Sequence, residues 1–189
     1  MAATRSTRTH RSVIDATAAL LAEGGLPAAT IDAIRDRSGV SKTTIYKHWP
    51  NRLCVAVDAF AESLAQETGL PDTGTARGDF TEQIRRVAAF YASPIGGVFV
   101  QLLAAAAQDR QAAGWLRTRL LASRHAGIED LWGRAVERGE TRPDIDPDIA
   151  IDAIFGPVMW RLLRGQTLSP ADPDKLADAV LAGILRDEP

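Results

Sequence analysis

The 189 residues comprise 46% hydrophobic and 24% charged side chains, with a net charge of −2. This length is sufficient for a hydrophobic core, and neither an 18-residue apolar run nor an N-terminal apolar segment occurs, so we expect neither a membrane-spanning nor a secreted protein. The one cysteine, Cys54, excludes an intrachain disulfide and agrees with a cytoplasmic location. We expect Cys54 to be a small core residue rather than a redox sensor, because no second cysteine could resolve its oxidised form.

The charges are distributed unevenly along the chain. Residues 1–52 hold 8 Lys and Arg against 4 Asp and Glu, a net of +4, whereas residues 53–189 hold 14 against 20, a net of −6. This asymmetry predicts a DNA-binding domain over residues 1–52 and a domain over residues 53–189 that does not bind DNA. The N-terminal Arg5, Arg8, His10 and Arg11 either reach a phosphate or a minor groove, or belong to a solvated terminus.

The first predicted elements are three helices, of which the second and third are short. Apolar spacing indicates a helix over Thr9–Glu23, which Gly24 and Gly25 end. Thr30 is the predicted N-cap of the next helix, and Gly39 supplies the positive φ of a sharp turn. Ser41 then caps a third helix from Lys42 to His48, which Pro50 stops.

The third helix is too short and too polar to be stable alone. Ile45 and Trp49 are its apolar anchors, and its other residues face outward. A structural corner would not need these basic and hydroxyl side chains side by side, so we interpret the segment as a helix-turn-helix whose second helix enters the major groove of DNA. The outward residues are Lys42, Thr43, Thr44, Tyr46, Lys47 and His48.

This N-terminal block resembles the DNA-binding domain of the TetR family of bacterial transcriptional regulators. The capping residues, the Gly39-Val40-Ser41 turn and Tyr46 follow the family pattern, whereas Trp49 stands where Phe is usual and Arg52 where Lys is usual. The resemblance and the helix orientation imply that Lys42, Thr43 and Thr44 read bases. The implied phosphate-binding residues are Thr30, Tyr46, Lys47, His48 and Arg52, and Ser41 completes the DNA-binding set as the helix cap.

The remaining chain also reads as helices, without a strand pattern or an internal repeat. The predicted helices cover about residues 51–67, 79–93, the apolar stretch after Pro94, 111–138, 147–165 and 173–185. The sequence therefore predicts an all-α fold of about nine helices: a three-helix helix-turn-helix head and a helical regulatory and dimerisation domain. Residues 135–163, AVERGETRPDIDPDIAIDAIFGPVMWRLL, also resemble a ligand-domain type of the TetR family.

The resemblance implies a homodimeric repressor that binds a roughly palindromic double-stranded operator and leaves it when a small apolar or aromatic effector binds. We expect an effector pocket within the body, because ligand sites in helical domains are apolar gaps with a few polar groups. Its candidate residues are Phe90, Tyr91, Phe99, Leu102, Leu103, Trp115, His125, Ile128, Trp132, Phe155 and Met159. The alternative is a packed core without a cavity.

The last two helices carry more apolar surface than one core face needs, so we expect them to form the dimer interface as a four-helix bundle. Closing the core of a single chain is the alternative role for the same residues. The candidates are Ile151, Ile154, Phe155, Val158, Met159, Leu162, Leu176, Val180, Ile184 and Leu185.

Enzymatic and cofactor motifs are not apparent in the sequence, and we expect no cofactor and no enzymatic activity. His125 and Glu129 share a helix face, but a metal site would need a third ligand that the sequence does not identify. We therefore expect no metal, and we interpret His125 and Glu129 as a local pair or as a polar group of the pocket. The alternative function is a small-ligand binding protein, or a helical enzyme, that retains the helix-turn-helix as a relic. The identity of the effector, the regulated genes and the sign of the regulation are not encoded in any recognisable motif.

Overall fold

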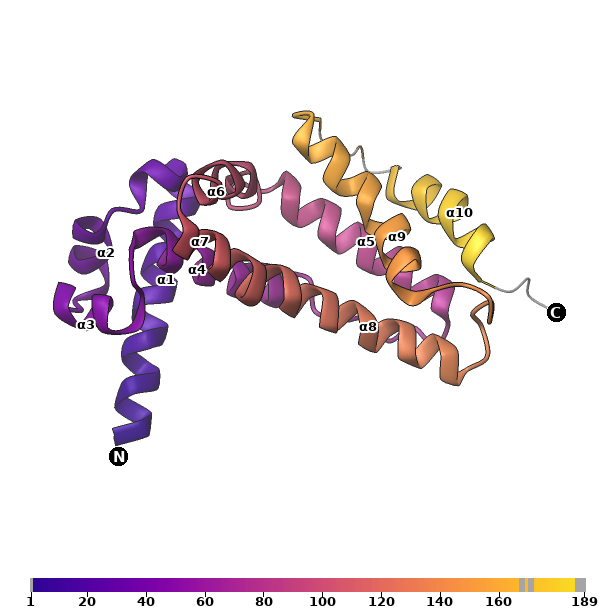
Figure 1. Cartoon of the computed structure of the whole chain (residues 1–189), viewed down its shortest axis with the longest axis horizontal. Coiled ribbons are helices and arrows are strands. Elements are labelled where there is room, and N and C mark those ends of the chain that lie inside the picture. The colour runs from indigo at the N-terminus through magenta and orange to yellow at the C-terminus, as the bar shows by residue number, and fades with distance from the viewer. Residues whose placement is uncertain (1, 167–168, 170–171, 186–189) are drawn as a thin grey trace. The chain divides into compact units, whose positions relative to one another are not determined.

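The structure is a computed structural model that describes residues 2–166, 169 and 172–185. This part of the chain is all-α, as predicted, and its one β-type contact is an isolated bridge between Thr141 and Leu185 (Figure 1). The elements are α1 (Ala2–Ala28), α2 (Ile31–Ser38), α3 (Lys42–His48), α4 (Arg52–Glu67), α5 (Ala76–Ala92), α6 (Val98–Ala106), α7 (Arg110–Trp115), the π-helical turn η1 (Leu116–Leu121), α8 (Ala122–Glu137), α9 (Pro147–Leu163) and α10 (Asp172–Ile184).

The segments α7, η1 and α8 follow one another without a break, which gives nine helices in the described residues when they are counted as one. The predicted helix over residues 111–138 is thereby confirmed, although the π-helical turn within it was not predicted. Helix α1 begins well before the predicted Thr9. Its regular geometry is interrupted at Gly24 and at Gly25, whose φ is 66°, so the predicted glycine break is confirmed.

Contacts divide the chain into two compact units. Unit 1 comprises Met1–Gln66 and Ser93–Ala122, and unit 2 comprises Glu67–Ala92 and Ser123–Pro189. The predicted functional boundary after residue 52 stays a prediction, because this division follows packing and not function. Helix α6, the apolar stretch after Pro94, lies in unit 1 with α1, and Gln101 of α6 accepts a hydrogen bond from the backbone N–H of Leu26 (2.9 Å).

The core of unit 1 joins the helix-turn-helix segment to α1, α4 and α6. Leu21, Ile34 and Ile45 are fully buried, and the ring of Phe60 on α4 stacks on that of Phe99 on α6 at 5.6 Å. Cys54 is also buried here, and burial raises the pKa of its thiol. This burial confirms the predicted place of Cys54 in the core. A protonated, inaccessible thiol is also unreactive.

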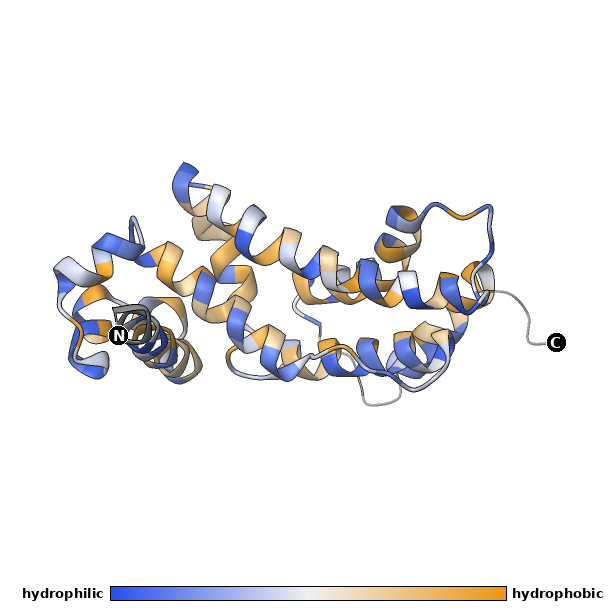
Figure 2. Cartoon of the chain, turned by 90° about the horizontal axis from the view of Figure 1, so that it is seen from below, coloured by the Kyte–Doolittle hydropathy of each residue, from blue (hydrophilic) through white to orange (hydrophobic). Residues whose placement is uncertain are grey.

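The core of unit 2 is formed by α5, α8, α9 and α10. Phe80 and Trp132 pack at a centroid distance of 6.3 Å within a buried cluster to which Ile154 and Leu181 also belong. Most helices carry both hydrophobic and hydrophilic residues, as amphipathic helices do (Figure 2). None of the helices among the described residues combines the length and apolarity that crossing a membrane requires.

Candidate nucleic-acid interface and ligand-binding residues

The turn between α2 and α3 has the geometry that its sequence predicts. The Thr30 hydroxyl accepts from the N–H of Ala33 (3.1 Å), and the Ser41 hydroxyl accepts from the N–H of Thr44 (3.3 Å). Gly39 has a φ of 70°, and no atom lies within 4 Å of a Cβ built there. Backbone conformation, and not lack of space, therefore requires the glycine.

Helix α3 is held in place by its buried apolar face and by a hydrogen bond at its C-terminal end. Ile45 and Trp49 are buried. The carboxylate of Asp58 on α4 accepts two indole N–H groups: Oδ2 accepts from Trp49 and Oδ1 from Trp115, each at 2.8 Å. Tertiary packing thus stabilises a seven-residue helix that would not persist alone.

The opposite face of α3 is open to solvent. Thr43, Lys47 and His48 are exposed, and Tyr46 exposes 52% of its surface. Thr44 is half-buried, and its hydroxyl lies 2.9 Å from that of Ser41. The predicted DNA-binding side chains are therefore gathered on one small surface.

Besides Ser41 and Thr44, the predicted DNA-binding residues Lys42, Arg52 and Thr30 have partners within unit 1. The Lys42 ammonium lies 2.7 Å from the Asp32 carboxylate, and this hydrogen bond lowers the pKa of Asp32. Arg52 donates to the backbone carbonyl of Leu26 (3.1 Å), and the Thr30 hydroxyl is occupied as a cap. Because a guanidinium has five N–H donors, Arg52 is oriented by this bond and keeps donors for a phosphate.

The N-terminal basic residues have different environments. Arg8 is exposed, whereas Arg11 pairs with Asp15 (2.9 Å) and Glu62 (3.3 Å), and the His10 ring stacks on Trp49 at 4.8 Å. The side chain of Arg5 lies outside the described residues. His10 and Arg11 are thus engaged within unit 1 and are not part of a free arm.

The predicted effector-pocket residues are divided between the two units. Phe99, Leu102, Leu103 and Trp115 lie in unit 1, and the other seven lie in unit 2. In unit 2, Phe90, Ile128 and Trp132 are buried, whereas Tyr91, His125, Phe155 and Met159 are half-buried. The predicted pocket therefore stays a prediction. Its unit 2 residues belong to one packed unit, so these can be considered together as one site.

A polar cluster that the sequence did not reveal lies within unit 2. Gln83 is fully buried; its amide donates to the Thr68 carbonyl (3.1 Å), and its Oε1 has no hydrogen-bond partner among the described residues. Arg124 donates to the Thr68 hydroxyl (3.0 Å), and burial lowers the pKa of Arg124. Burial also raises the pKa of Tyr91 to about 12, although the nearby Arg124 opposes this shift.

A separate hollow of about 660 Å³ lies at the end of α9. Its walls include Trp160, Arg161 and Arg164, and it is lined by none of the predicted pocket residues. Arg161 pairs with Asp172 (3.0 Å) at its edge.

Burial divides the residues predicted for the dimer interface into two groups, and the interface itself stays a prediction. Five of them are buried in the core of the single chain, which is the alternative role expected for these residues: Ile151, Ile154, Val158, Ile184 and Leu185. Phe155, Met159, Leu162, Leu176 and Val180 are half-buried. The large apolar side chains that α9 exposes are instead Ile149, Trp160 and Leu163, with exposures of 67%, 62% and 52%.

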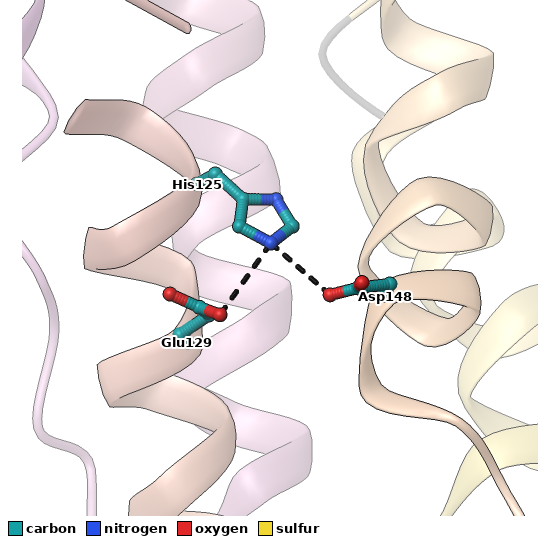
Figure 3. Close-up of side chains that lie close together, drawn as sticks. All are labelled: His125, Glu129 and Asp148. Atoms are coloured by element: carbon teal, nitrogen blue, oxygen red, sulfur yellow. Dashed lines mark hydrogen bonds and ion pairs between the residues drawn. The ribbon is translucent and has the colours of Figure 1, made fainter. Parts of the chain in front are cut away.

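The structure supplies the third group that a metal site at His125 and Glu129 lacked in the sequence. Asp148 on α9 places Oδ1 3.1 Å from Nε2 of His125 on α8 (Figure 3). Asp148 is 23 residues from His125 in sequence, so helical spacing could not have identified it.

Comparison with known proteins agrees with this architecture. Residues 13–53 match the family model described as bacterial regulatory proteins, tetR family, and residues 70–180 match the tetracyclin repressor-like C-terminal domain. An uncharacterized HTH-type transcriptional regulator, YdeS of Bacillus subtilis, is 35% identical over 159 residues, which cover 84% of this chain and 80% of YdeS.

Solved structures give the same result. The TetR family transcription regulator SCO0332 superimposes with a TM-score of 0.85 at 31% identity, covering 93% of this chain and 97% of that one. The regulator FadR of Bacillus subtilis, solved in complex with stearoyl-CoA, has a TM-score of 0.57 at 19% identity, covering 91% and 95%, and shares the fold. With a family model over more than half of its residues, a relative of 35% identity and an intact helix-turn-helix, the chain belongs to the TetR family of DNA-binding transcriptional regulators.

Proposed function

We propose that the protein is a homodimeric repressor that a small-molecule effector releases from a roughly palindromic operator. The observation that carries this proposal is α3: a short helix buried on one face by Ile45 and Trp49 and exposing hydroxyl, aromatic and basic side chains on the other. Two such helices in a symmetric dimer would enter successive major grooves about 34–36 Å apart. The alternative, a ligand-binding protein or enzyme with a relic helix-turn-helix, gives no reason for this exposed set.

We assign base reading to Lys42 and Thr43 at the start of α3, with Thr44 at its edge. Tyr46, Lys47, His48 and Arg52 would bind phosphates, and Thr30 and Ser41 would act mainly by capping α2 and α3. The capping hydrogen bonds support this division, because a hydroxyl that accepts from the helix backbone is held in one orientation. Its predicted consequence is that Thr30→Ala weakens DNA binding by destabilising the head, whereas Lys47→Ala weakens it without a change in stability.

Fluorescence anisotropy tests DNA binding directly. The labelled probe is the DNA upstream of the protein's own gene, and an unrelated fragment of equal length is the competitor. We expect preferential binding to the upstream fragment and at least about tenfold weaker binding by Lys47→Ala. Lys175→Ala, which removes an exposed lysine of α10, is the matched control. If the protein binds both fragments with equal affinity, and if Lys47→Ala binds as Lys175→Ala does, the result favours a ligand-binding protein or enzyme with a relic helix-turn-helix.

For the dimer we propose a surface on α9 and α10 that combines Ile149, Trp160 and Leu163 with the half-buried Phe155, Met159, Leu162, Leu176 and Val180. The support is energetic: a tryptophan and two large aliphatic side chains exposed on one helix are costly in water and gain by burial against a second copy.

For the effector we propose a site in unit 2 whose apolar walls include Phe90, Ile128 and Trp132. Tyr91, Gln83 and Arg124 would be its polar groups. A buried amide oxygen without a partner and a desolvated arginine both gain from a ligand that supplies a hydrogen-bond donor and an anionic group. This predicts an apolar or aromatic effector that carries a carboxylate. Titrating such carboxylates and their neutral amides, with tryptophan fluorescence and operator release as readouts, tests both the site and the charge preference.

A further inference from the structure

One imidazole and two carboxylates from two helices meet on the surface of unit 2 (Figure 3). Glu129 follows His125 by one turn of α8, and Asp148 lies in the first turn of α9. From Nε2 of His125, Oδ1 of Asp148 lies at 3.1 Å and Oε1 of Glu129 at 3.6 Å, and the three atoms are all within 4.8 Å of one another. We propose that these residues bind a divalent transition-metal ion of the Zn²⁺ type.

The separations of the three atoms fit such an ion. Zinc binds imidazole nitrogen and carboxylate oxygen at about 2.0–2.2 Å, which places tetrahedral ligands about 3.4 Å apart. The two distances from Nε2 are already close to this value. The two carboxylate oxygens lie within 4.8 Å of each other, and the side chain of Glu129, which is 54% exposed, has space to adjust to the ion. Three protein ligands leave a fourth position for water.

The donor set selects the class of metal. Mg²⁺ and Ca²⁺ prefer all-oxygen sites, whereas an imidazole nitrogen suits zinc, copper, iron and nickel. The charge also favours a cation, because two carboxylates face one imidazole and neither forms an ion pair with Lys or Arg among the described residues.

The backbone already holds the ligands near these positions. Helical spacing fixes His125 and Glu129 on one face of α8. Asp146 caps α9 by accepting the N–H of Asp148 (2.9 Å), which fixes the first turn from which the third carboxylate projects. A bound ion would therefore link α8 to α9 with little rearrangement.

Isothermal titration of the full chain, purified without a histidine tag, with Zn²⁺ in the presence of excess Mg²⁺ tests the site. We expect one ion per chain, and Co²⁺ in its place should give the visible absorption bands of a site with nitrogen and oxygen ligands. His125→Ala and Asp148→Asn should each weaken binding by about 100-fold, at least as much as the loss of an outer-shell partner does. Asp152→Asn removes the same charge from an exposed residue one turn further along α9 and should bind as the parent does.

Several results would overturn the proposal. Absence of Zn²⁺ binding would leave only an ion-pair cluster, and binding that persists in His125→Ala would place the ion elsewhere, for instance at His10 and His48. Equal losses in Asp152→Asn and Asp148→Asn would show general charge attraction in place of ligation. Circular dichroism of metal-free variants verifies folding, and if His125→Ala fails to fold, His125→Gln tests the same ligand.

Discussion

The carboxylate that joins two tryptophans in unit 1 leads to a sharp prediction about stability. Asp58 accepts the indole N–H groups of Trp49 and Trp115 through different oxygens, each at 2.8 Å. In Asp58→Asn, one oxygen is replaced by an NH₂ group, which is itself a donor. One indole keeps its acceptor, and the other faces a second donor at hydrogen-bond distance.

The expected magnitude follows from the lost bond. A hydrogen bond to a charged group contributes about 1.5–3 kcal/mol, and a part-buried donor without a partner adds a further cost. We therefore expect Asp58→Asn to lower the free energy of unfolding by about 2–3 kcal/mol, which shifts Tm by roughly 2–4 °C for each kcal/mol in a chain of this size. DNA affinity should fall as well, because Trp49 ends α3.

A double-mutant cycle with Trp115→Phe tests the cause. In the Trp115→Phe background the asparagine oxygen can accept from Trp49 while its NH₂ group faces a ring without an N–H. The cost of Asp58→Asn should therefore fall below about 1 kcal/mol. Urea unfolding followed by circular dichroism at one fixed protein concentration measures all four variants, since the proposed dimer would make stability concentration-dependent.

The control is Asp36→Asn, which removes an exposed carboxylate of the same unit and should change stability by less than about 0.5 kcal/mol. The reasoning is refuted if Asp58→Asn is as stable as the parent. It is also refuted if the substitution costs the same with and without the Trp115 indole, because the two hydrogen bonds would then be irrelevant to the loss.

Three further predictions concern pH, DNA and assembly. Burial acts to raise the pKa of Asp79, but hydrogen bonds from Thr73 and Arg138 outweigh it, so the folded pKa is lowered. Its contribution to stability is complete above about pH 4 and is lost as pH falls through the folded pKa; Asp79→Asn should flatten the acid limb of stability measured by urea unfolding. If a dimer neutralises about eight phosphates, log K for DNA should fall with log salt at a slope of about −7, and Lys47→Ala should reduce the slope by about 2; an unchanged slope in anisotropy titrations would remove Lys47 from the phosphate contacts. Trp160→Glu should give monomers in sedimentation velocity, whereas an intact dimer would place the interface away from this side chain.

The features that could be predicted from sequence are those fixed by near neighbours. Thr30, Gly39 and Ser41 act on backbone groups within a few residues, so their roles follow from residue type and spacing alone. The helical character of the chain is predictable for the same reason.

The remaining features depend on contacts between distant segments. Asp58 meets Trp115 across 57 residues, and Arg124 meets Thr68 across 56. In α9 the apolar residues are spread around the helix, so periodicity could not separate the buried Ile154 from the exposed Trp160. Only the packed fold determines which apolar side chain is left for a partner.

The ion pair between Lys42 and Asp32 changes how salt dependence reports on DNA contacts. If DNA takes Lys42 from Asp32, a counterion leaves the phosphates, while the Asp32 carboxylate keeps only Arg35 (2.9 Å) as its cationic partner and can attract a further cation from solution. Uptake of a cation by Asp32 would offset part of the counterion release, so Lys42 would add less to the slope of log K against log salt than a lysine without an acidic partner. Under the proposed function, Asp32 would compete with nucleic acid for Lys42, and a DNA sequence that offers Lys42 no base contact would break this ion pair without compensation.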